Sequence, residues 1–210
     1  MKCILDKNWQ FLDNGEWKTV TVPHTPKIED YDVYHPFQGK SYYRYQLTLP
    51  KEELKKRIVL EFEAVMQYCE VKVNGKTEAT HKGGYLPFNV DLTGIARETN
   101  TIEVMADNSD DPDIPLGKPW DTLDFCYFGG IYRNVNLYIT DKLAITHPVM
   151  ENITAGGGVF VRYEDVSENF ARVLVKVNVI NAYTCLKRAV CCLELSYNGQ
   201  KIGGGNLAEE

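Results

Sequence analysis

The sequence lacks any apolar run approaching the roughly eighteen residues that a membrane-spanning helix needs, so no membrane partner is predicted. Charged residues appear within the first residues, Met1 to Asp6, before any apolar stretch long enough for a signal peptide. We therefore expect a cytoplasmic protein, with periplasmic or secreted location left open because a removed leader leaves no trace. There is no cluster of Lys and Arg, and the net charge of −6 opposes nonspecific binding to nucleic acid.

Metal-binding motifs are also missing. No Cys-x-x-Cys pair occurs, and no His stands near a cysteine with zinc-site spacing. The adjacent Cys191 and Cys192 lie on a predicted strand and so point to opposite faces. We predict free thiols packed as small hydrophobic groups, with a structural disulfide as the alternative, and no metal or cofactor. The six cysteines stand at positions 3, 69, 126, 185, 191 and 192.

Helical periodicity is scarce, and residues 51–56, after Pro50, form the one predicted helical turn in the first half. Short runs of alternating apolar and polar residues dominate instead, separated by turn signals such as Asn74-Gly75. This pattern predicts an all-β fold, an antiparallel jelly-roll sandwich. The predicted strands are 8–11, 17–22, 41–49, 57–65, 68–73, 76–81, 85–92, 101–106 and 132–140.

The character of the sequence changes after Asp141. We predict a jelly-roll domain over 1–141 and the start of an immunoglobulin-like sandwich over 142–210. Such a sandwich needs about seven strands, and only about four to five fit, so we expect a truncated second domain whose open edge pairs between copies. The run Gly203-Gly204-Gly205 and the pair Glu209-Glu210 are expected to offer nothing that closes a sheet. The predicted strands are 143–146, 159–163, 171–179, 189–197 and 200–202.

A long connection follows the strand that ends at Ala106 and continues to Tyr132. It is far longer than the two to six residues usual between strands, and such loops are usually functional. Its aromatic residues, among them Trp120, argue against disorder, and it carries six aspartates between Asp107 and Asp124. Aromatic rings stack on sugar faces and carboxylates accept hydrogen bonds from hydroxyls, so the loop is predicted to contact sugar.

Six short motifs recur in a fixed order over residues 9–135. They are Trp9-Gln10-Phe11, Val20-Thr21-Val22-Pro23-His24-Thr25, Tyr43-Arg44-Tyr45, Val71-Lys72-Val73-Asn74-Gly75, Gly83-Gly84-Tyr85-Leu86-Pro87-Phe88 and Gly129-Gly130-Ile131-Tyr132-Arg133-Asn134-Val135. In this order they resemble the N-terminal jelly roll of glycoside hydrolase family 2, which includes β-galactosidases, β-glucuronidases and β-mannosidases. One departure is Pro26, where the family often has Trp.

The resemblance implies a retaining β-glycosidase, most like a β-galactosidase, that is a homo-oligomer when intact. The family's two catalytic glutamates lie on a (β/α)₈ barrel, and no such barrel is encoded in these 210 residues. This stretch alone is therefore expected to be inactive and to contain no catalytic residue. We interpret Glu61, Glu63 and Glu70 as solvated strand faces.

The resemblance also implies a sugar contact. In the family an aspartate six residues before the second glycine of the Gly-Gly-Ile-Tyr-Arg motif contacts the sugar, and here that position is Asp124. Asp121 and Trp120 are further candidates for substrate binding. The alternatives are that Asp124 caps a turn in its own loop and that Trp120 packs the loop on the sheet.

Two further residues near this loop have structural interpretations. We expect His24 to bridge backbone groups and Arg133 to pair with a loop carboxylate or with carbonyl groups.

Two other function classes stay open at this point. An autonomous carbohydrate-binding module would use the same loop, since jelly rolls often serve as lectins. A structural adhesion-type β-protein is disfavoured by an aromatic and acidic loop. Within the family, a β-glucuronidase or β-mannosidase is an alternative to the β-galactosidase.

Overall fold

The structure, a computed structural model, describes residues 1–28, 32, 35–115, 117–123, 125 and 127–209. The chain divides into two compact units, Met1–Ile139 and Thr140–Glu210, and each is described by itself. In the described part, no helix is long and apolar enough to cross a membrane.

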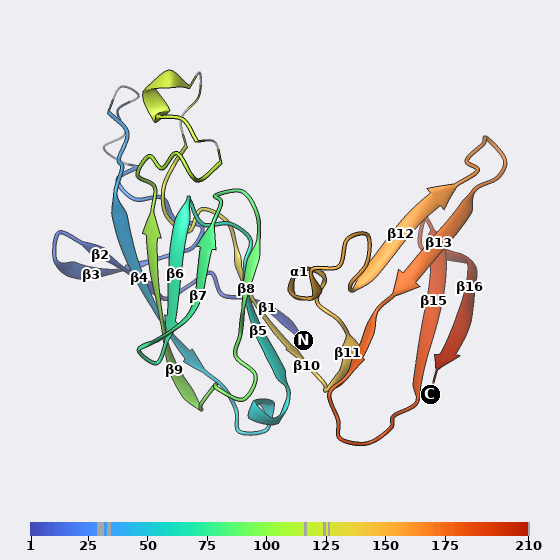
Figure 1. The fold of residues 1–210 in the computed structure, drawn as a ribbon. Helices are drawn as coiled ribbons and strands as arrows, with labels where there is room; N and C mark the ends of the chain where they lie inside the picture. The colour runs from blue at the N-terminus through green and yellow to red at the C-terminus, as the bar shows by residue number, and fades with distance from the viewer. Residues whose placement is uncertain (29–31, 33–34, 116, 124, 126, 210) are drawn as a thin grey trace. The chain divides into compact units, whose positions relative to one another are not determined.

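The first unit is a sandwich of two antiparallel sheets (Figure 1). A six-stranded sheet has the order β3-β2-β4-β9-β6-β7, and a four-stranded sheet has the order β1-β10-β5-β8. Two short 3₁₀ helices, η1 (Glu53–Lys55) and η2 (Trp120–Thr122), lie outside the sheets. The strands are β1 (Lys2–Ile4), β2 (Trp9–Asp13), β3 (Glu16–Val20), β4 (Lys40–Thr48), β5 (Arg57–Phe62), β6 (Tyr68–Val73), β7 (Lys76–Lys82), β8 (Phe88–Asp91), β9 (Thr99–Asp107) and β10 (Val135–Thr140).

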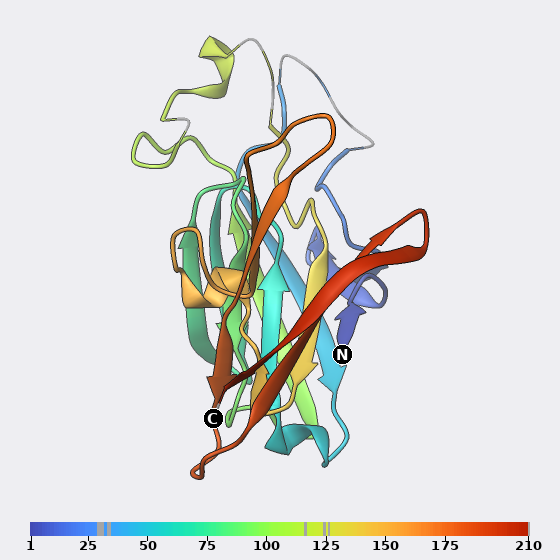
Figure 2. The same ribbon diagram turned by 90° about the vertical axis from the view of Figure 1, so that its right-hand side faces the viewer.

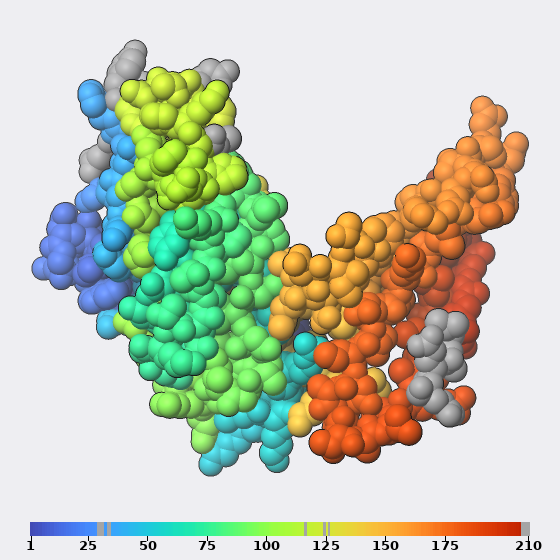
Figure 3. Space-filling model, viewed as in Figure 1, coloured from blue at the N-terminus to red at the C-terminus, as the bar shows by residue number. Residues whose placement is uncertain are grey.

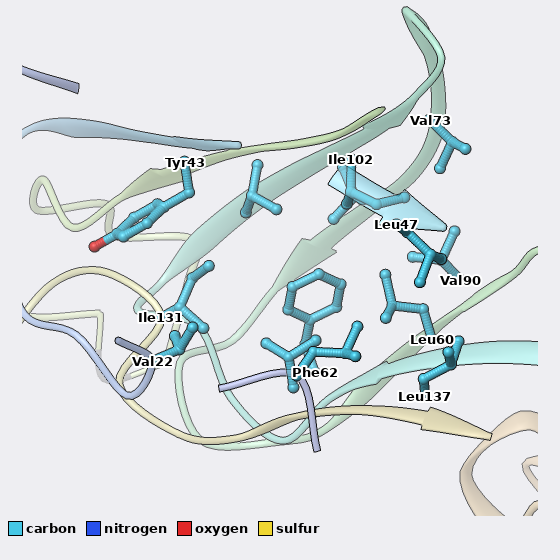
Figure 4. Close-up of a cluster of buried hydrophobic side chains, with 14 of the residues drawn as sticks. Val22, Tyr43, Leu47, Leu60, Phe62, Val73, Val90, Ile102, Ile131 and Leu137 are labelled. Atoms are coloured by element: carbon cyan, nitrogen blue, oxygen red, sulfur yellow. The ribbon is translucent and has the colours of Figure 1, made fainter. Parts of the chain in front are cut away.

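The core between the two sheets follows from strand alternation. Along β9, Ile102 and Val104 are buried while Thr101 and Glu103 face outward, because successive side chains point to opposite faces. Figure 4 shows side chains from both sheets meeting in this core, among them Ile102 and Leu60. Burying one such side chain contributes about 1.5–3 kcal/mol. The predicted antiparallel all-β sandwich is confirmed.

The second unit is built from three two-stranded antiparallel sheets, β11–β14, β12–β13 and β15–β16, and one short helix. Many apolar side chains on its strands are exposed, such as Val159 and Leu195. Its immunoglobulin-like character stays a prediction. The elements are β11 (Leu143–Ile145), α1 (Pro148–Glu151), β12 (Val159–Glu164), β13 (Arg172–Val177), β14 (Val179–Asn181), β15 (Ala189–Tyr197) and β16 (Gln200–Glu209).

Two sequence predictions about the strands are wrong. The last strand was predicted to end at Ile202, yet β16 continues through the glycine run, and Gly203 and Gly205 pair with Leu195 and Leu193. Ladder hydrogen bonds use only backbone N–H and C=O groups, so glycine can extend a strand despite its low propensity. Glu61 was interpreted as solvated but is 7% exposed, and its carboxylate accepts hydrogen bonds from Asn136 Nδ2 and the Tyr138 hydroxyl.

The cysteines are only partly as expected. All five within the described residues are free, but Cys185 and Cys192 are exposed rather than packed. Cys69 is fully buried, and burial raises the pKa of its thiol. Cys126 lies outside the described residues.

The hairpin of β2 and β3 carries a carboxylate held by two lysines. Asp13 accepts hydrogen bonds from Lys18 Nζ at 2.6 Å and Lys27 Nζ at 2.7 Å. These bonds, Lys18 first, lower the pKa of Asp13 from its ordinary 3.8 to about 2. The Asp13 carboxylate thereby links the hairpin to the start of the segment that joins β3 to β4.

A pH titration tests this link. Because folding depresses the pKa of Asp13, its contribution to stability is complete above about pH 4 and is lost as the pH falls towards about 2. We expect the side-chain carboxyl carbon of Asp13, followed by NMR, to titrate with a midpoint near pH 2. Lys18→Ala should move the midpoint upward, whereas Lys76→Ala, which removes a lysine paired with Glu78, should not. A titration midpoint near the ordinary 3.8 in the unmodified chain would show that the two lysines do not hold the Asp13 carboxylate.

Candidate functional site

Two long segments gather at one end of the first unit, the connection between β9 and β10 and the connection between β3 and β4. Figures 1 and 2 both show η2 beyond the ends of β4 and β9, and in Figure 3 its atoms, in yellow-green, lie at the same end of the unit. In register, Lys40 at the start of β4 faces Asp107 at the end of β9. The pairing of these two strands therefore brings both segments to the same end of the sheet.

Asn108 joins the two segments at their base. Its Oδ1 accepts a hydrogen bond from the Gly39 backbone N–H at 2.9 Å, and its Nδ2 donates to the Phe37 carbonyl at 2.7 Å. The Asn108 side chain is 1% exposed, so these bonds are shielded from water. A buried amide satisfied on both atoms holds the backbone on either side of it in place.

Asp110 connects the two segments a second time. Its Oδ1 accepts from Gln38 Nε2 at 2.8 Å, from the Tyr127 hydroxyl at 2.6 Å and from the Trp120 backbone N–H at 3.3 Å. Burial, followed by the Asp110 hydrogen bond, raises the pKa of Tyr127, so its hydroxyl stays protonated and continues to donate. One carboxylate therefore ties both ends of the β9–β10 loop to the β3–β4 segment.

The end of the loop passes through a narrow space at Gly130. Its φ of +87° is a left-handed conformation that glycine adopts readily. A Cβ there would lie 2.7 Å from Pro26 Cδ and 2.8 Å from the His24 carbonyl oxygen, and it would also collide with the Tyr43 hydroxyl. The Pro26 ring, which replaces the family's common Trp, therefore contacts the Gly-Gly motif directly.

His24 and Arg133 have structural contacts around this point. His24 Nδ1 lies 3.0 Å from the Tyr43 hydroxyl, and the His24 backbone N–H donates to the Ile131 carbonyl. Arg133 Nη1 donates to the Tyr85 carbonyl at 3.5 Å, as expected for a residue that pairs with carbonyl groups. His24 therefore links the segment after β3 to the end of the β9–β10 connection, and Arg133 links that end to Tyr85.

A hollow of about 480 Å³ lies beside the loop. Its carboxylates and amide can accept hydrogen bonds from hydroxyl groups, and Lys82 can donate them. Among the described residues there is no group of three metal-binding side chains. The lining residues are Gln67, Tyr68, Lys82, Asp107, Ser109, Asp110, Asp111, Pro112 and Ile114.

The predicted site residues lie in or next to η2. Trp120 begins η2 and is half-buried, and Asp121 follows it and is exposed. Asp124 lies outside the described residues. Sequence reasoning did not single out Asp110, the shared acceptor, because nothing in the local pattern distinguishes it from the other loop aspartates. It also passed over Phe125 and Phe128, which are 48% and 38% exposed in the same loop.

The comparison with known protein families decides the family. Residues 2–141 match the model described as glycosyl hydrolases family 2, sugar binding domain. The chain belongs to glycosyl hydrolase family 2. The family resemblance inferred from the six sequence motifs is thereby confirmed.

Relatives in the family include enzymes of two kinds. A β-glucuronidase of Bacteroides fragilis is 34% identical over 85% of this chain, and a β-galactosidase of Thermoanaerobacterium thermosulfurigenes is 29% identical over 83%. The chain spans 26% and 27% of these two proteins. A crystal structure of a β-galactosidase homologue from Bacteroides fragilis matches all of this chain and 33% of its own with 29% identity and a TM-score of 0.80.

The role of Asp110 in this family 2 domain can be tested by removing its carboxylate. Asp110→Ala leaves the Tyr127 hydroxyl, Gln38 and the Trp120 N–H without their acceptor. The cost is about 1–3 kcal/mol for the buried Tyr127 hydroxyl and smaller for the two exposed bonds. We expect faster hydrogen exchange at Trp120 and across 109–115, with exchange in β4 unchanged. Asp113→Ala is the matched control, since Asp113 is an exposed aspartate of the same loop. Equal exchange in both variants would show that Asp110 does not order the loop.

Gly130→Ala tests the narrow passage of the same loop. The new Cβ must displace Pro26, Tyr43 or the His24 backbone, so we expect a loss of about 2–5 kcal/mol in unfolding free energy. Denaturant unfolding followed by tryptophan fluorescence measures it, since all three Trp residues lie in the first unit. Gly15→Ala is the control, because Gly15 has a φ of +84° and no atom within 4 Å of the added Cβ. Similar losses in both variants would show that the cost comes from backbone strain at positive φ alone and that atoms around Gly130 add nothing to it.

Proposed function

We propose that this chain is the non-catalytic N-terminal region of a retaining β-glycosidase, most like a β-galactosidase. Its β9–β10 loop contributes to the mouth of an active site whose two catalytic glutamates lie on a (β/α)₈ barrel outside these 210 residues. Support comes from the family match and from relatives that are β-galactosidases and β-glucuronidases. In this proposal the intact enzyme acts on a β-glycoside and is a homo-oligomer.

The ordered loop carries the proposal. A loop that contacts substrate must be held in one conformation, since each misplaced contact loses binding energy in the transition state. Asn108 and Asp110 provide this order by tying the loop to the β3–β4 segment. The loop then presents Trp120 and Asp121, and the proposed sugar contact Asp124 follows four residues after Trp120.

The chemistry assigned to the loop is recognition rather than bond cleavage. An ionised aspartate accepts hydrogen bonds from two neighbouring sugar hydroxyls, and these bonds are stronger than those between neutral groups. A ring such as that of Trp120 can stack against the apolar face of a pyranose. Contacts of this kind, remote from the scissile bond, orient the sugar for the catalytic carboxylates.

Replacing Asp124 in the intact protein tests this function. We expect Asp124→Ala to lower kcat/KM for a nitrophenyl β-galactoside by about 10- to 100-fold, the loss of roughly 1.5–3 kcal/mol from one hydrogen bond to a charged group. Asp113→Ala should leave kcat/KM unchanged, because Asp113 is exposed and has no assigned role. An unchanged kcat/KM in Asp124→Ala would remove the sugar contact from the proposal. If the unmodified enzyme preferred a nitrophenyl β-glucuronide to the β-galactoside, the proposed activity would be that of a β-glucuronidase.

The autonomous carbohydrate-binding module remains the second candidate, favoured by the sugar-binding description of the matching family model. Calorimetric titration of the 210-residue chain with galactose and with glucuronic acid separates the two candidates. Binding tighter than about 1 mM, a free energy beyond roughly −4 kcal/mol, that Asp124→Ala abolishes would favour the module, because that binding would be at the loop.

A further inference from the structure

A second surface of the first unit has the features of a binding site. A groove of about 240 Å³ lies on the outer face of the six-stranded sheet, apart from the hollow beside the β9–β10 loop. Strands β4, β6 and β9 of that sheet and the β2–β3 hairpin supply its walls. The lining residues are Leu12, Trp17, Tyr42, Tyr43, Glu70, Lys72, Glu103, Val104 and Met105.

Strand pairing explains why a groove exists there. β2 pairs with β3 over five residue pairs but with β4 over only two, Gln10 with Arg44 and Phe11 with Tyr43. The end of the hairpin therefore separates from the sheet, and Figure 1 shows it projecting beside β4. Leu12 faces Trp17 across the hairpin, and these two side chains form one wall of the groove, with Tyr42 beside them.

Aromatic rings dominate this end of the groove. Trp17 is 39% exposed and Tyr42 is 43% exposed. The Arg44 guanidinium lies 4.4 Å from the centre of the Trp17 ring, and Gln10 Oε1 accepts from both its Nε and Nη2. The Arg44 guanidinium thus stacks on the indole and holds it in place, while 39% of Trp17 stays exposed. Fixed aromatic rings suit ligands with flat apolar faces, because little side-chain entropy is lost on binding.

Several polar groups in the groove have no partner in the described part of the chain. Across the described residues, the Trp17 indole N–H, the Tyr42 hydroxyl and the Glu103 carboxylate make no hydrogen bond or ion pair. A donor, an acceptor and a hydroxyl that does both are therefore available to a ligand beside the rings. Sugar hydroxyls both donate and accept, so a glycan can satisfy all three.

The charges of the groove select the kind of glycan. In the strand register, Arg44 faces Glu103, and Glu103 faces Lys72. Lys72 in turn lies 3.1 Å from Glu70. Two cations therefore stand with two carboxylates, and this balance disfavours an acidic ligand, whose charge would find no excess of cations. The volume is just below the roughly 300–1,000 Å³ of pockets for drug-sized ligands, so one or two sugar rings occupy it at a time.

We propose that this groove binds a neutral β-linked glycan chain, with Trp17 and Tyr42 stacking on its rings and Glu103 accepting from its hydroxyls. The site goes beyond the loop contact proposed above, because it would hold a polymer on the sheet face rather than a single sugar at an active site. A separate binding face of this kind raises the local concentration of a polymeric substrate.

Affinity gel electrophoresis of the 210-residue chain tests the proposal. The gels contain a β-1,4-galactan, a β-1,4-mannan or a mixed-linkage β-glucan as neutral probes, and polygalacturonate as the acidic probe. We expect retardation by at least one neutral probe and none by polygalacturonate. No retardation by any neutral probe overturns the proposal, and retardation by polygalacturonate alone overturns the neutral assignment.

Variants locate the binding on the groove. Trp17→Ala should weaken retardation about tenfold, as expected for the loss of one stacking ring. Tyr42→Ala and Glu103→Gln should each weaken it severalfold, and Glu103→Gln keeps the side-chain shape, so the site can be tested even if Trp17→Ala unfolds. Tyr197→Ala in the second unit is the control for an exposed aromatic residue and should bind as the unmodified chain does. Unchanged retardation of Tyr42→Ala and Glu103→Gln would overturn the proposal.

Discussion

The pairing of β4 with β9 is the interaction on which the rest of the first unit depends. The two strands pair antiparallel without a register shift from Lys40 with Asp107 to Thr48 with Thr99. Because side chains alternate along paired strands, this one register sets both faces of the sheet. A slip of one residue would move Tyr43 out of the core and Tyr42 into it, and with them the groove and the anchor of Gly130 would be lost.

The same register explains how so long a loop is ordered. It places Gly39 and Asn108 next to each other at the end of the sheet, where the Asn108 amide satisfies backbone groups of the neighbouring segment. From that fixed start, the Asp110 carboxylate reaches Gln38 and Tyr127. A small number of polar contacts thus replaces the continuous hydrogen-bond ladder that orders a strand. Asn108 is the buried member of this set, so losing its amide would leave backbone groups of the neighbouring segment unsatisfied.

Sequence reasoning succeeded where the signal is local and failed where it is not. The Asn74-Gly75 turn and the alternating strands on both sides of it appear as predicted, in β6 and β7. Glu61 also alternates in its strand, yet it is buried because Asn136 and Tyr138 from β10 lie beside it and donate to its carboxylate. The glycine run was misjudged for a similar reason, since its strand exists only through pairing with β15.

By itself the sequence determined the all-β class, the family, the hairpins and the position of the long aromatic and acidic loop, because these depend on residue type, spacing and short-range alternation. Only the tertiary structure decided that Asp110 serves donors at positions 38, 120 and 127, and that Trp17 stands beside Tyr42 and Glu103 in one groove. Those arrangements join residues far apart in the chain. They are set by which strands become neighbours, and strand pairing is a property of the whole sandwich that no local pattern encodes.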